Sequence, residues 1–453
     1  MDRKQRIVLV VSILASFVAF LDGSVVNVAL PAISHELGGG LVTQEWVVDA
    51  YLLALGSLIL LAGSLSDLFG RRRILEVGLV GFGITSILCT VAPSSLFLII
   101  LRAIQGMAGA LLVPSSLALI MSTFTGRAQG KAIGSWTAWT GIAFIVGPLL
   151  GGFLVDSVSW RLVFAINIVP IMLCLGLLRL VVQTEHPAGT RLDVIGASLC
   201  SLGLSGVVFS LIEQPDYGWG SPLIVSFLCG GILLVGGFIW YEHRYSSRAM
   251  LPLLLFRVRN FSAGNMATLG IYSGLAIATF LVVIYLQQVS GYSALAAGFA
   301  LLPVTILMFF LSPRFGALSA VYGPRVFMTI GPLTAGVGFL LMLRVSSHVQ
   351  YWTELFPGVL VFALGLSTTV APLTSAVLSD IGPVRAGIAS AVNNAVARIA
   401  GLLAVALAGV IVGPHLDPPG FHRAMVVTAA LVWFGGLASW IGIRNHKDTP
   451  TGV

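Results

Sequence analysis

Apolar residues form long runs that recur along the whole chain and are separated by short polar segments. An α-helix rises 1.5 Å per residue, so about 20 apolar residues cross the roughly 30 Å hydrocarbon core of a bilayer. The pattern therefore predicts fourteen membrane-spanning helices. Their expected positions are 7–31, 45–63, 74–93, 97–121, 131–155, 162–182, 193–213, 222–241, 263–288, 294–313, 327–345, 354–378, 386–412 and 424–443.

The composition agrees with this pattern. The 453 residues are 57% hydrophobic and 9% charged, with a mean hydropathy of +1.00, which is more apolar surface than a soluble core of ordinary size can hide. The first run, 7–31, is too long for the apolar part of a signal peptide, so we expect this helix to be retained. The predicted fold class is an all-α integral membrane protein.

Lysine and arginine are distributed unevenly between the two sides of the predicted bundle. With a cytoplasmic N-terminus, most of the 24 basic residues fall in inner segments, whereas Arg161, Arg344 and Arg423 fall in outer ones. Positive charge in short loops marks the cytoplasmic side, so both termini are expected there. The net charge of +7 is spread over these segments and forms no single patch, which argues against nucleic acid as a partner.

One polar turn occurs twice in the chain. The segments GSLSDLFGRRR (63–73) and GALSAVYGPRV (316–326) share Gly, Leu, Ser, Gly and Arg at the same offsets, although Asp67 of the first copy is Ala320 in the second. The repeat indicates that the chain contains two comparable six-helix halves. Such halves are the architecture of rocking secondary transporters, with the substrate site between the halves. The alternative is that a basic turn flanked by glycines arose twice by chance. The separation of the two copies along the chain predicts a six-helix half at 1–185, an inserted helix pair at 186–242, a cytoplasmic linker at 243–262 and a second six-helix half at 263–453.

No residue pattern indicates a metal site, a cofactor or an enzyme centre. The four cysteines lie singly in apolar runs, and the seven histidines fall in loops, at segment ends or in the tail. The segment GRAQGKA (126–132) has one residue too few between its glycines for a phosphate loop, and it has Ala132 where such a loop has Ser or Thr. We therefore expect no metal, no cofactor and no use of ATP.

Asp22 and Arg102 are the charged residues that we expect deepest in the first six helices. Counted from the inner face, both lie about 21 to 22 Å along their helices, and Asp22 is the only carboxylate expected well inside them. An ionised group there costs about 2.5–3.5 kcal/mol, which makes each a candidate functional residue. Arg102 favours the ionised form of Asp22 and desolvation favours its neutral form, so Asp22 is able to exchange a proton. The alternative is a static ion pair that only orients the helices.

Other polar residues of the predicted helices are candidates for a substrate cavity. Asp49 is expected about one turn below the outer surface, where contact with interfacial water is an alternative to a role in transport. Arg398, on the helix at 386–412, either holds an anionic group or binds carbonyls of a neighbouring helix. The candidate cavity residues are Asn27, Asp49, Tyr51, Gln105, Tyr285, Gln288, Asn393, Asn394 and Arg398.

The helix at 131–155 carries a cluster of small residues. Gly147, Pro148, Gly151 and Gly152 fall within six residues. Small residues at this spacing allow close helix contact, and Pro148 removes a backbone hydrogen bond, so a bent and tightly packed helix is expected.

These stretches together resemble the major facilitator superfamily, and specifically its fourteen-helix drug:proton antiporter branch. The resemblance rests on GSLSDLFGRRR as the cytoplasmic signature, LDGSVVNVALP in the first helix and LRAIQG at Arg102. It also rests on the antiporter motif from Gly134 to Gly152, in which Ala143 replaces a glycine, and on SWRLVFAINIVP and YLQQVSGYSALAAGFALLP. The similarity covers nearly the whole chain.

The resemblance implies roles for matching residues and a proton gradient as the energy source. Asp22 and Arg102 would couple proton movement, and the antiport element would comprise Gly134, Gly147, Pro148, Gly151 and Gly152. The inner gate would comprise Gly63, Asp67, Gly70, Arg71, Arg72 and Arg73. The implied function is export of monocationic, neutral or amphipathic drugs across a bacterial inner membrane, by a protein that works as a monomer among lipids. Export of a metabolite, lipid or siderophore is the alternative within this fold, and a membrane enzyme or receptor is the alternative outside it.

Overall fold

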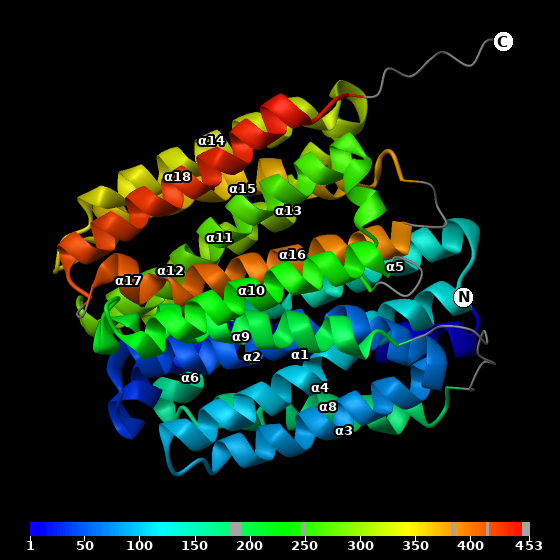
Figure 1. The fold of residues 1–453 in the computed structure, drawn as a ribbon, viewed down its shortest axis with the longest axis horizontal. Helices are drawn as coiled ribbons and strands as arrows, with labels where there is room; N and C mark the ends of the chain where they lie inside the picture. The colour runs from blue at the N-terminus through cyan, green and yellow to red at the C-terminus, as the bar shows by residue number, and fades with distance from the viewer. Residues whose placement is uncertain (182–191, 246–249, 382–385, 414–415, 446–453) are drawn as a thin grey trace. The chain divides into compact units, whose positions relative to one another are not determined.

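The computed structural model describes residues 1–181, 192–245, 250–381, 386–413 and 416–445. These residues form helices and no strand (Figure 1). Thirteen helical segments among them are long and apolar enough to cross a membrane, and a shorter apolar helix, Leu162–Leu178, lies at the remaining predicted position. The prediction of an all-α membrane protein with fourteen spanning segments is confirmed.

The helices divide into two compact units. Unit 1 comprises 1–251, 280–299 and 405–415, and unit 2 comprises 252–279, 300–404 and 416–453. The units follow contacts and not chain order, so the division at residues 185, 242 and 262 stays a prediction.

Unit 1 is built around its first helix, α1, which packs against α2, α4, α5, α6 and α8. α9 and α10 pack on each other, and α9 also packs on α2. The α-helices that lie wholly in this unit are α1 (Arg3–Leu37), α2 (Gly40–Phe69), α3 (Arg71–Thr90), α4 (Ser95–Thr123), α5 (Gly126–Gly141), α6 (Ala143–Ser157), α7 (Leu162–Ala165), α8 (Ile168–Leu178), α9 (Val194–Tyr217), α10 (Pro222–Arg244) and α17 (Ala408–Val412). α1 is covered by these neighbours where it carries Asp22, so this side chain is removed from lipid and water.

In unit 2, α15 packs against α13 and α14, and α14 also packs against α18 (Figure 1). The helices wholly in this unit are α13 (Leu302–Tyr322), α14 (Pro324–Leu341), α15 (Phe356–Leu378) and α18 (Pro418–Gly442), with short turns of helix at Leu253–Arg257, Met342–Arg344 and Tyr351–Leu355. α11 (Arg259–Gln288), α12 (Ala294–Ala300) and α16 (Ala386–Ala406) have residues in both units.

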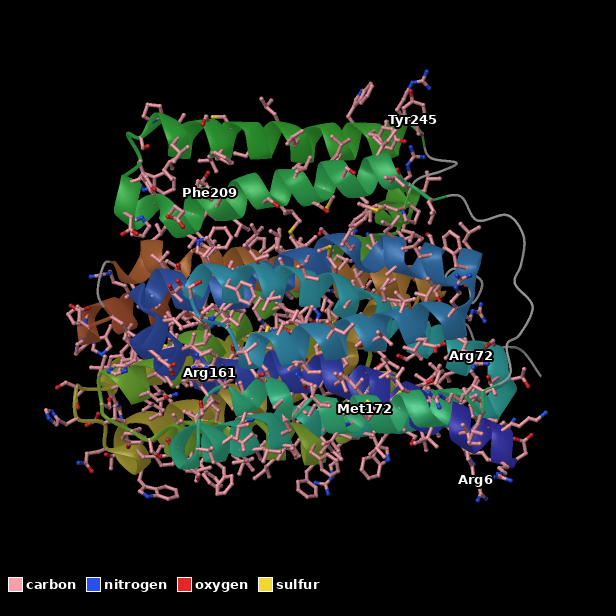
Figure 2. All side chains as sticks on the ribbon, turned by 90° about the horizontal axis from the view of Figure 1, so that it is seen from below. Arg6, Arg72, Arg161, Met172, Phe209 and Tyr245 are labelled. Carbon is pink, nitrogen blue, oxygen red and sulfur yellow. The ribbon has the colours of Figure 1, made fainter. Side chains whose placement is uncertain are left out.

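Three basic residues of unit 1 can be located relative to the ends of its helices. Figure 2 shows Arg6 and Arg72 at one end of its helices and Arg161 toward the other. This is the separation of inner and outer segments that the unequal distribution of lysine and arginine requires.

The repeated polar turn has the same backbone in both copies. Gly70 ends α2 and begins α3 with φ 101° and ψ 128°, and Gly323 ends α13 and begins α14 with φ 82° and ψ 152°. A positive φ of this size is unfavourable for residues with a side chain, so glycine is needed at both positions. The shared conformation supports a genuine structural repeat over a chance recurrence.

The segment that follows α10 is held by two buried acids. Asp193 accepts hydrogen bonds from the N–H groups of Gly196 at 2.8 Å and Met250 at 3.3 Å, and Glu242 accepts one from Leu251 at 2.9 Å. The expected cytoplasmic linker at 243–262 includes residues 246–249, which lie outside the described residues. The part that follows them is fixed to the inserted helix pair.

Candidate functional site

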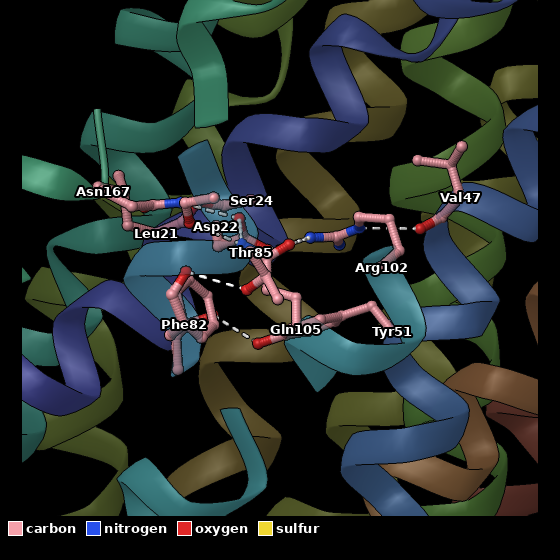
Figure 3. Close-up of polar contacts among 12 residues, drawn as sticks. Leu21, Asp22, Ser24, Val47, Tyr51, Phe82, Thr85, Arg102, Gln105 and Asn167 are labelled. Carbon is pink, nitrogen blue, oxygen red and sulfur yellow. Dashed lines mark hydrogen bonds and ion pairs between the residues drawn. The ribbon is translucent and has the colours of Figure 1, made fainter. Parts of the chain in front are cut away.

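Asp22 and Arg102 form an ion pair in the interior of unit 1. Asp22 is 0% exposed and Arg102 is 1% exposed, and Nη1 of Arg102 lies 2.5 Å from Oδ2 of Asp22 (Figure 3). The two residues come from α1 and α4, which pack against each other. The equal depth expected from the sequence therefore corresponds to direct contact.

The Asp22 carboxylate also accepts hydrogen bonds from two side-chain amides. Asn167 donates from Nδ2 to Oδ1 at 2.9 Å, and Gln105 donates from Nε2 to the same oxygen at 3.3 Å. Gln105 donates to Ser86 as well, at 2.8 Å. Donors from α4 and from the start of α8 thus surround the carboxylate.

Arg102 contacts three further groups besides Asp22. Its Nε–H donates to the carbonyl of Val47 at 3.1 Å, its Nη1 donates to Oε1 of Gln105 at 2.7 Å, and its guanidinium lies 4.4 Å from the centre of the Tyr51 ring. The arginine thus connects α1, α2 and α4. A proton taken up by Asp22 would weaken the ion pair and, through Arg102, change how these three helices are held together.

Asn167 and Ser86 were not among the residues selected from the sequence. Asn167 stands as a single amide in the apolar segment VFAINIVP, and Ser86 is one of several hydroxyl residues in apolar helices. A buried amide in an apolar run was the available signal, but only the packing of α8 against α1 and α3 shows that it faces Asp22.

The glycines of the antiporter motif lie in close helix contacts. A Cβ at Gly147 would lie 2.0 Å from Oγ of Ser24, and one at Gly151 would lie 2.6 Å from Cγ2 of Val25. Ser24 also donates to the carbonyl of Ala143 at 3.0 Å. α6 is thereby held against α1 within one turn of Asp22.

A second face of α6 contacts α12. A Cβ at Gly152 would lie 2.5 Å from Cα of Leu295, and one at Gly298 would lie 2.7 Å from the carbonyl oxygen of Pro148. Both carboxylate oxygens of Asp156 accept backbone N–H groups at 2.9 Å, from Ala294 and Leu295. α6 is therefore closely packed against α1 on one side and α12 on the other.

The bend expected in this helix is present as a break. α5 ends at Gly141 and α6 begins at Ala143, five residues before Pro148. Pro148 has no N–H to donate to Phe144, so the first turn of α6 lacks one backbone hydrogen bond.

We expect Gly152→Ala to lower export strongly, because its Cβ would meet the backbone of Leu295, which cannot move aside as a flexible side chain can. Gly134→Ala is the matched control within the same motif, because a Cβ at Gly134 meets nothing within 4 Å. Efflux of a fluorescent dye at equal protein abundance measures both. Equal activities of the two variants would contradict the role given to the contact between α6 and α12.

The two copies of the polar turn are held by different partners. In the first copy, Asp67 pairs with Arg71 at 3.2 Å, and both side chains are partly exposed. In the second, Oδ1 of Asn445 accepts the N–H of Arg325 at 3.2 Å, and Nε of Arg325 donates to the carbonyl of Trp440 at 2.9 Å. Asn445, which follows α18, thus contacts the second turn, which has Ala320 where the first turn has Asp67.

We expect Asp67→Asn to weaken or abolish efflux at normal protein abundance, because the pair with Arg71 is partly exposed and contributes little to stability. Ala320→Asp is not expected to restore activity, since Asn445 and Trp440 already hold the second turn. Drug accumulation in cells and immunoblots measure the two effects. Restoration by Ala320→Asp would show that the difference between the two turns has no functional meaning.

The remaining cavity candidates are divided between the two units. Tyr51 and Gln105 are buried beside Arg102, and Tyr285 is buried elsewhere in unit 1. The partly exposed residues are Asn27, Asn394 and Arg398, and Gln288 is exposed. Asn393 donates to Asn265 at 3.2 Å and to Thr268 at 2.8 Å, both in unit 2. Of these candidates, Tyr51 and Gln105 contact the ion pair, and the substrate cavity stays a prediction.

The expectation that Asp49 touches interfacial water is wrong. Asp49 is 0% exposed, and so is Glu45, one helical turn earlier on α2. Asp22 is therefore not the only carboxylate inside the first six helices. Depth along a helix was estimated from the sequence, but α9 and α17 pack on the outer part of α2 and cover these acids.

No three His, Cys, Asp or Glu side chains come together as a possible metal site anywhere in the described part of the chain. Asp22 instead binds an arginine and two amides, and Asp156 binds two backbone N–H groups. The arrangement around Asp22 places an ionisable acid and a cation in direct contact inside the membrane-spanning bundle of unit 1.

Comparison with known proteins extends this description. The sequence pattern of the Major Facilitator Superfamily matches residues 12–405. A puromycin resistance protein of Streptomyces alboniger is 35% identical over 407 residues, which cover 88% of this chain and 80% of that protein. A multidrug resistance protein of Mycobacterium tuberculosis is 32% identical over 430 residues, which cover 94% and 80%.

The fold agrees with solved structures at much lower identity. The crystal structure of a D-xylose–proton symporter matches with a TM-score of 0.71 and 15% identity, over 98% of both chains. The helices and the buried ion pair define a multi-pass α-helical membrane transporter. The chain belongs to the major facilitator superfamily, and its similar relatives include antibiotic resistance and multidrug resistance proteins.

Proposed function

We propose that this protein is a proton-coupled antiporter that exports amphipathic drugs or antibiotics by alternating access. The observation that carries the proposal is the Asp22–Arg102 pair, an acid and a base buried between membrane-spanning helices with a 2.5 Å contact. Ionisable residues inside a membrane are costly, and in transporters they serve as proton relays or substrate sites.

Asp22 is the proton carrier in this mechanism. In the protonated state it loses its attraction for Arg102, and release of the proton restores the ion pair shown in Figure 3. Arg102 also holds the carbonyl of Val47, so each protonation step changes the interactions between α1, α4 and α2. This link between charge and helix packing is what coupling requires.

The relatives support the substrate class. Their names refer to resistance to puromycin and methylenomycin A and to export of tetracenomycin C and cephamycin. These names support antibiotics as the substrate class. Because all of these relatives are bacterial, and Arg6 and Arg72 lie at the end of unit 1 opposite Arg161, we place the protein in a bacterial inner membrane with cytoplasmic termini.

The purified protein in vesicles with an imposed pH gradient tests the proposal. We expect uphill accumulation of ethidium or puromycin, with measurable proton movement in the opposite direction and collapse on addition of a protonophore. Transport that continues without a gradient, or that is restricted to a sugar, a lipid or a metal chelate, would refute drug:proton antiport.

A further inference from the structure

Two carboxyl groups on one face of α2 are buried together, apart from the Asp22 site. Glu45 and Asp49 are four residues apart, which places them one above the other on the helix. Each is 0% exposed. Ionisable side chains this deeply buried require partners that compensate their charge, so their contacts decide what they do.

Few hydrogen-bond donors reach the oxygens of these two carboxyl groups. Oε1 of Glu45 accepts the N–H of Gly409 in α17 at 2.5 Å, and Oε2 has no partner. Neither oxygen of Asp49 has a partner. Glycine at 409 is what allows this approach, because a Cβ there would lie 3.0 Å and 3.3 Å from the two oxygens of Glu45.

No cation of the described residues compensates the pair. The neighbouring acid on α9 is Glu213, which accepts a hydrogen bond from Trp46 at 2.7 Å and would repel further negative charge. The cation on α4 is Arg102, which is paired with Asp22 of α1. Of the other groups near the outer end of α1, His35 and Glu36 are exposed and Glu36 pairs with Arg161. α17 contributes only apolar residues and Gly409, and the charged residues of α3, Arg71 to Arg73 and Glu76, lie at its opposite end.

Two ionised carboxylates in this setting would be unstable. A buried charge without a partner costs several kcal/mol, and two like charges one turn apart add repulsion. A carboxyl group that binds a proton becomes neutral, and its protonated oxygen can then donate a hydrogen bond. The contrast with Asp22 is direct, because Asp22 has an arginine and two amide donors.

We propose that Glu45 and Asp49 form a second proton-binding site, which carries one proton per transport cycle in addition to the proton on Asp22. This proposal rests on the proposed function. In the state described here Asp22 is paired with an arginine and two amides, whereas three of the four carboxyl oxygens of the α2 pair have no hydrogen-bond partner. The second acid keeps its proton when the first releases its own, so the pair does not become doubly charged.

An additional proton changes the electrical balance of transport. Two protons entering for one monovalent cation leaving moves one net positive charge inward, whereas one proton for one cation moves none. Export of a cation by the wild-type protein should therefore respond to membrane potential as well as to the pH gradient.

Vesicles containing the purified protein and ethidium as the single substrate test this inference. Glu45→Gln/Asp49→Asn is expected to move one proton fewer per exported cation and to lose its response to a potassium-diffusion potential, while transport driven by the pH gradient remains. Glu213→Gln is the matched control, since this acid is partly exposed and bonded to Trp46, and it should behave as wild type. An unchanged proton ratio and an unchanged response to potential in the double variant would overturn the proposal.

Infrared spectroscopy tests the site without transport. The carbonyl-stretch band of protonated carboxyl groups at neutral pH should be smaller in the double variant, and in Asp49→Asn alone if the double variant does not fold. An unchanged band would overturn the second site. Absence of proton movement in the wild-type protein would overturn the proposed function instead, so the two failures are distinguishable.

Discussion

Asp22→Asn is expected to abolish uphill export driven by a pH gradient. The substitution keeps the shape of the side chain but removes the group that binds and releases a proton, and it leaves Arg102 without a counter-charge. Binding of neutral compounds should survive. The measurement is substrate accumulation against a gradient, with simultaneous proton movement, in vesicles that contain the purified protein.

Asp22→Glu is the matched variant for this experiment. It keeps a titratable group on a longer stem, so it should retain partial activity if its carboxylate still reaches Arg102 and Asn167. If Asp22→Asn still concentrated substrate and moved protons, Asp22 would not be the carrier. The pair Glu45 and Asp49 would then become the first candidate for coupling.

Arg102→Met is expected to cause the largest loss of stability. Breaking a buried ion pair by removing one partner costs about 3–5 kcal/mol, because the remaining charge is left unpaired. The variant also leaves the carbonyl of Val47 without its donor. We expect low abundance in the membrane and early thermal unfolding in detergent, measured by size-exclusion chromatography with a fluorescent tag after heating.

The double variant Asp22→Asn/Arg102→Met separates stability from coupling. With both charges removed, abundance and thermal stability should recover toward wild type, whereas uphill transport should remain absent. A double variant that is as unstable as Arg102→Met would show that the other contacts of Arg102, and not the unpaired Asp22, determine its effect.

The fold was predictable because apolar runs and the positions of basic residues are properties of the chain itself. The equal depth of Asp22 and Arg102 followed from counting residues along two helices of known rise, and the packing of α1 on α4 turns this into contact. Asn167 was not predictable in this way, because which residue of α8 faces α1 depends on how α8 rotates and packs. For the same reason the burial of Asp49 was not predictable, since residue counting does not show that α9 and α17 pack on α2.

The antiporter motif shows a similar limit. Its glycines indicated a close helix contact, and α6 does contact α1 closely at Gly147 and Gly151. The contact of Gly152 with α12 joins segments more than 140 residues apart, and no periodicity of either segment encodes it. Gly134 belongs to the same motif, but a Cβ added there would meet nothing within 4 Å. The motif alone therefore does not distinguish a glycine in a close helix contact from one that tolerates a side chain.

The different partners of the two polar turns have a consequence for biosynthesis. The partner of Arg71 in the first turn, Asp67, has already been synthesised when α3 begins, so this turn is complete as soon as α3 is inserted. Arg325 must wait for Trp440 and Asn445, which are translated more than a hundred residues later. During synthesis the first turn therefore reaches its final form early, while the N-terminus of α14 stays without these contacts until α18 has entered the membrane.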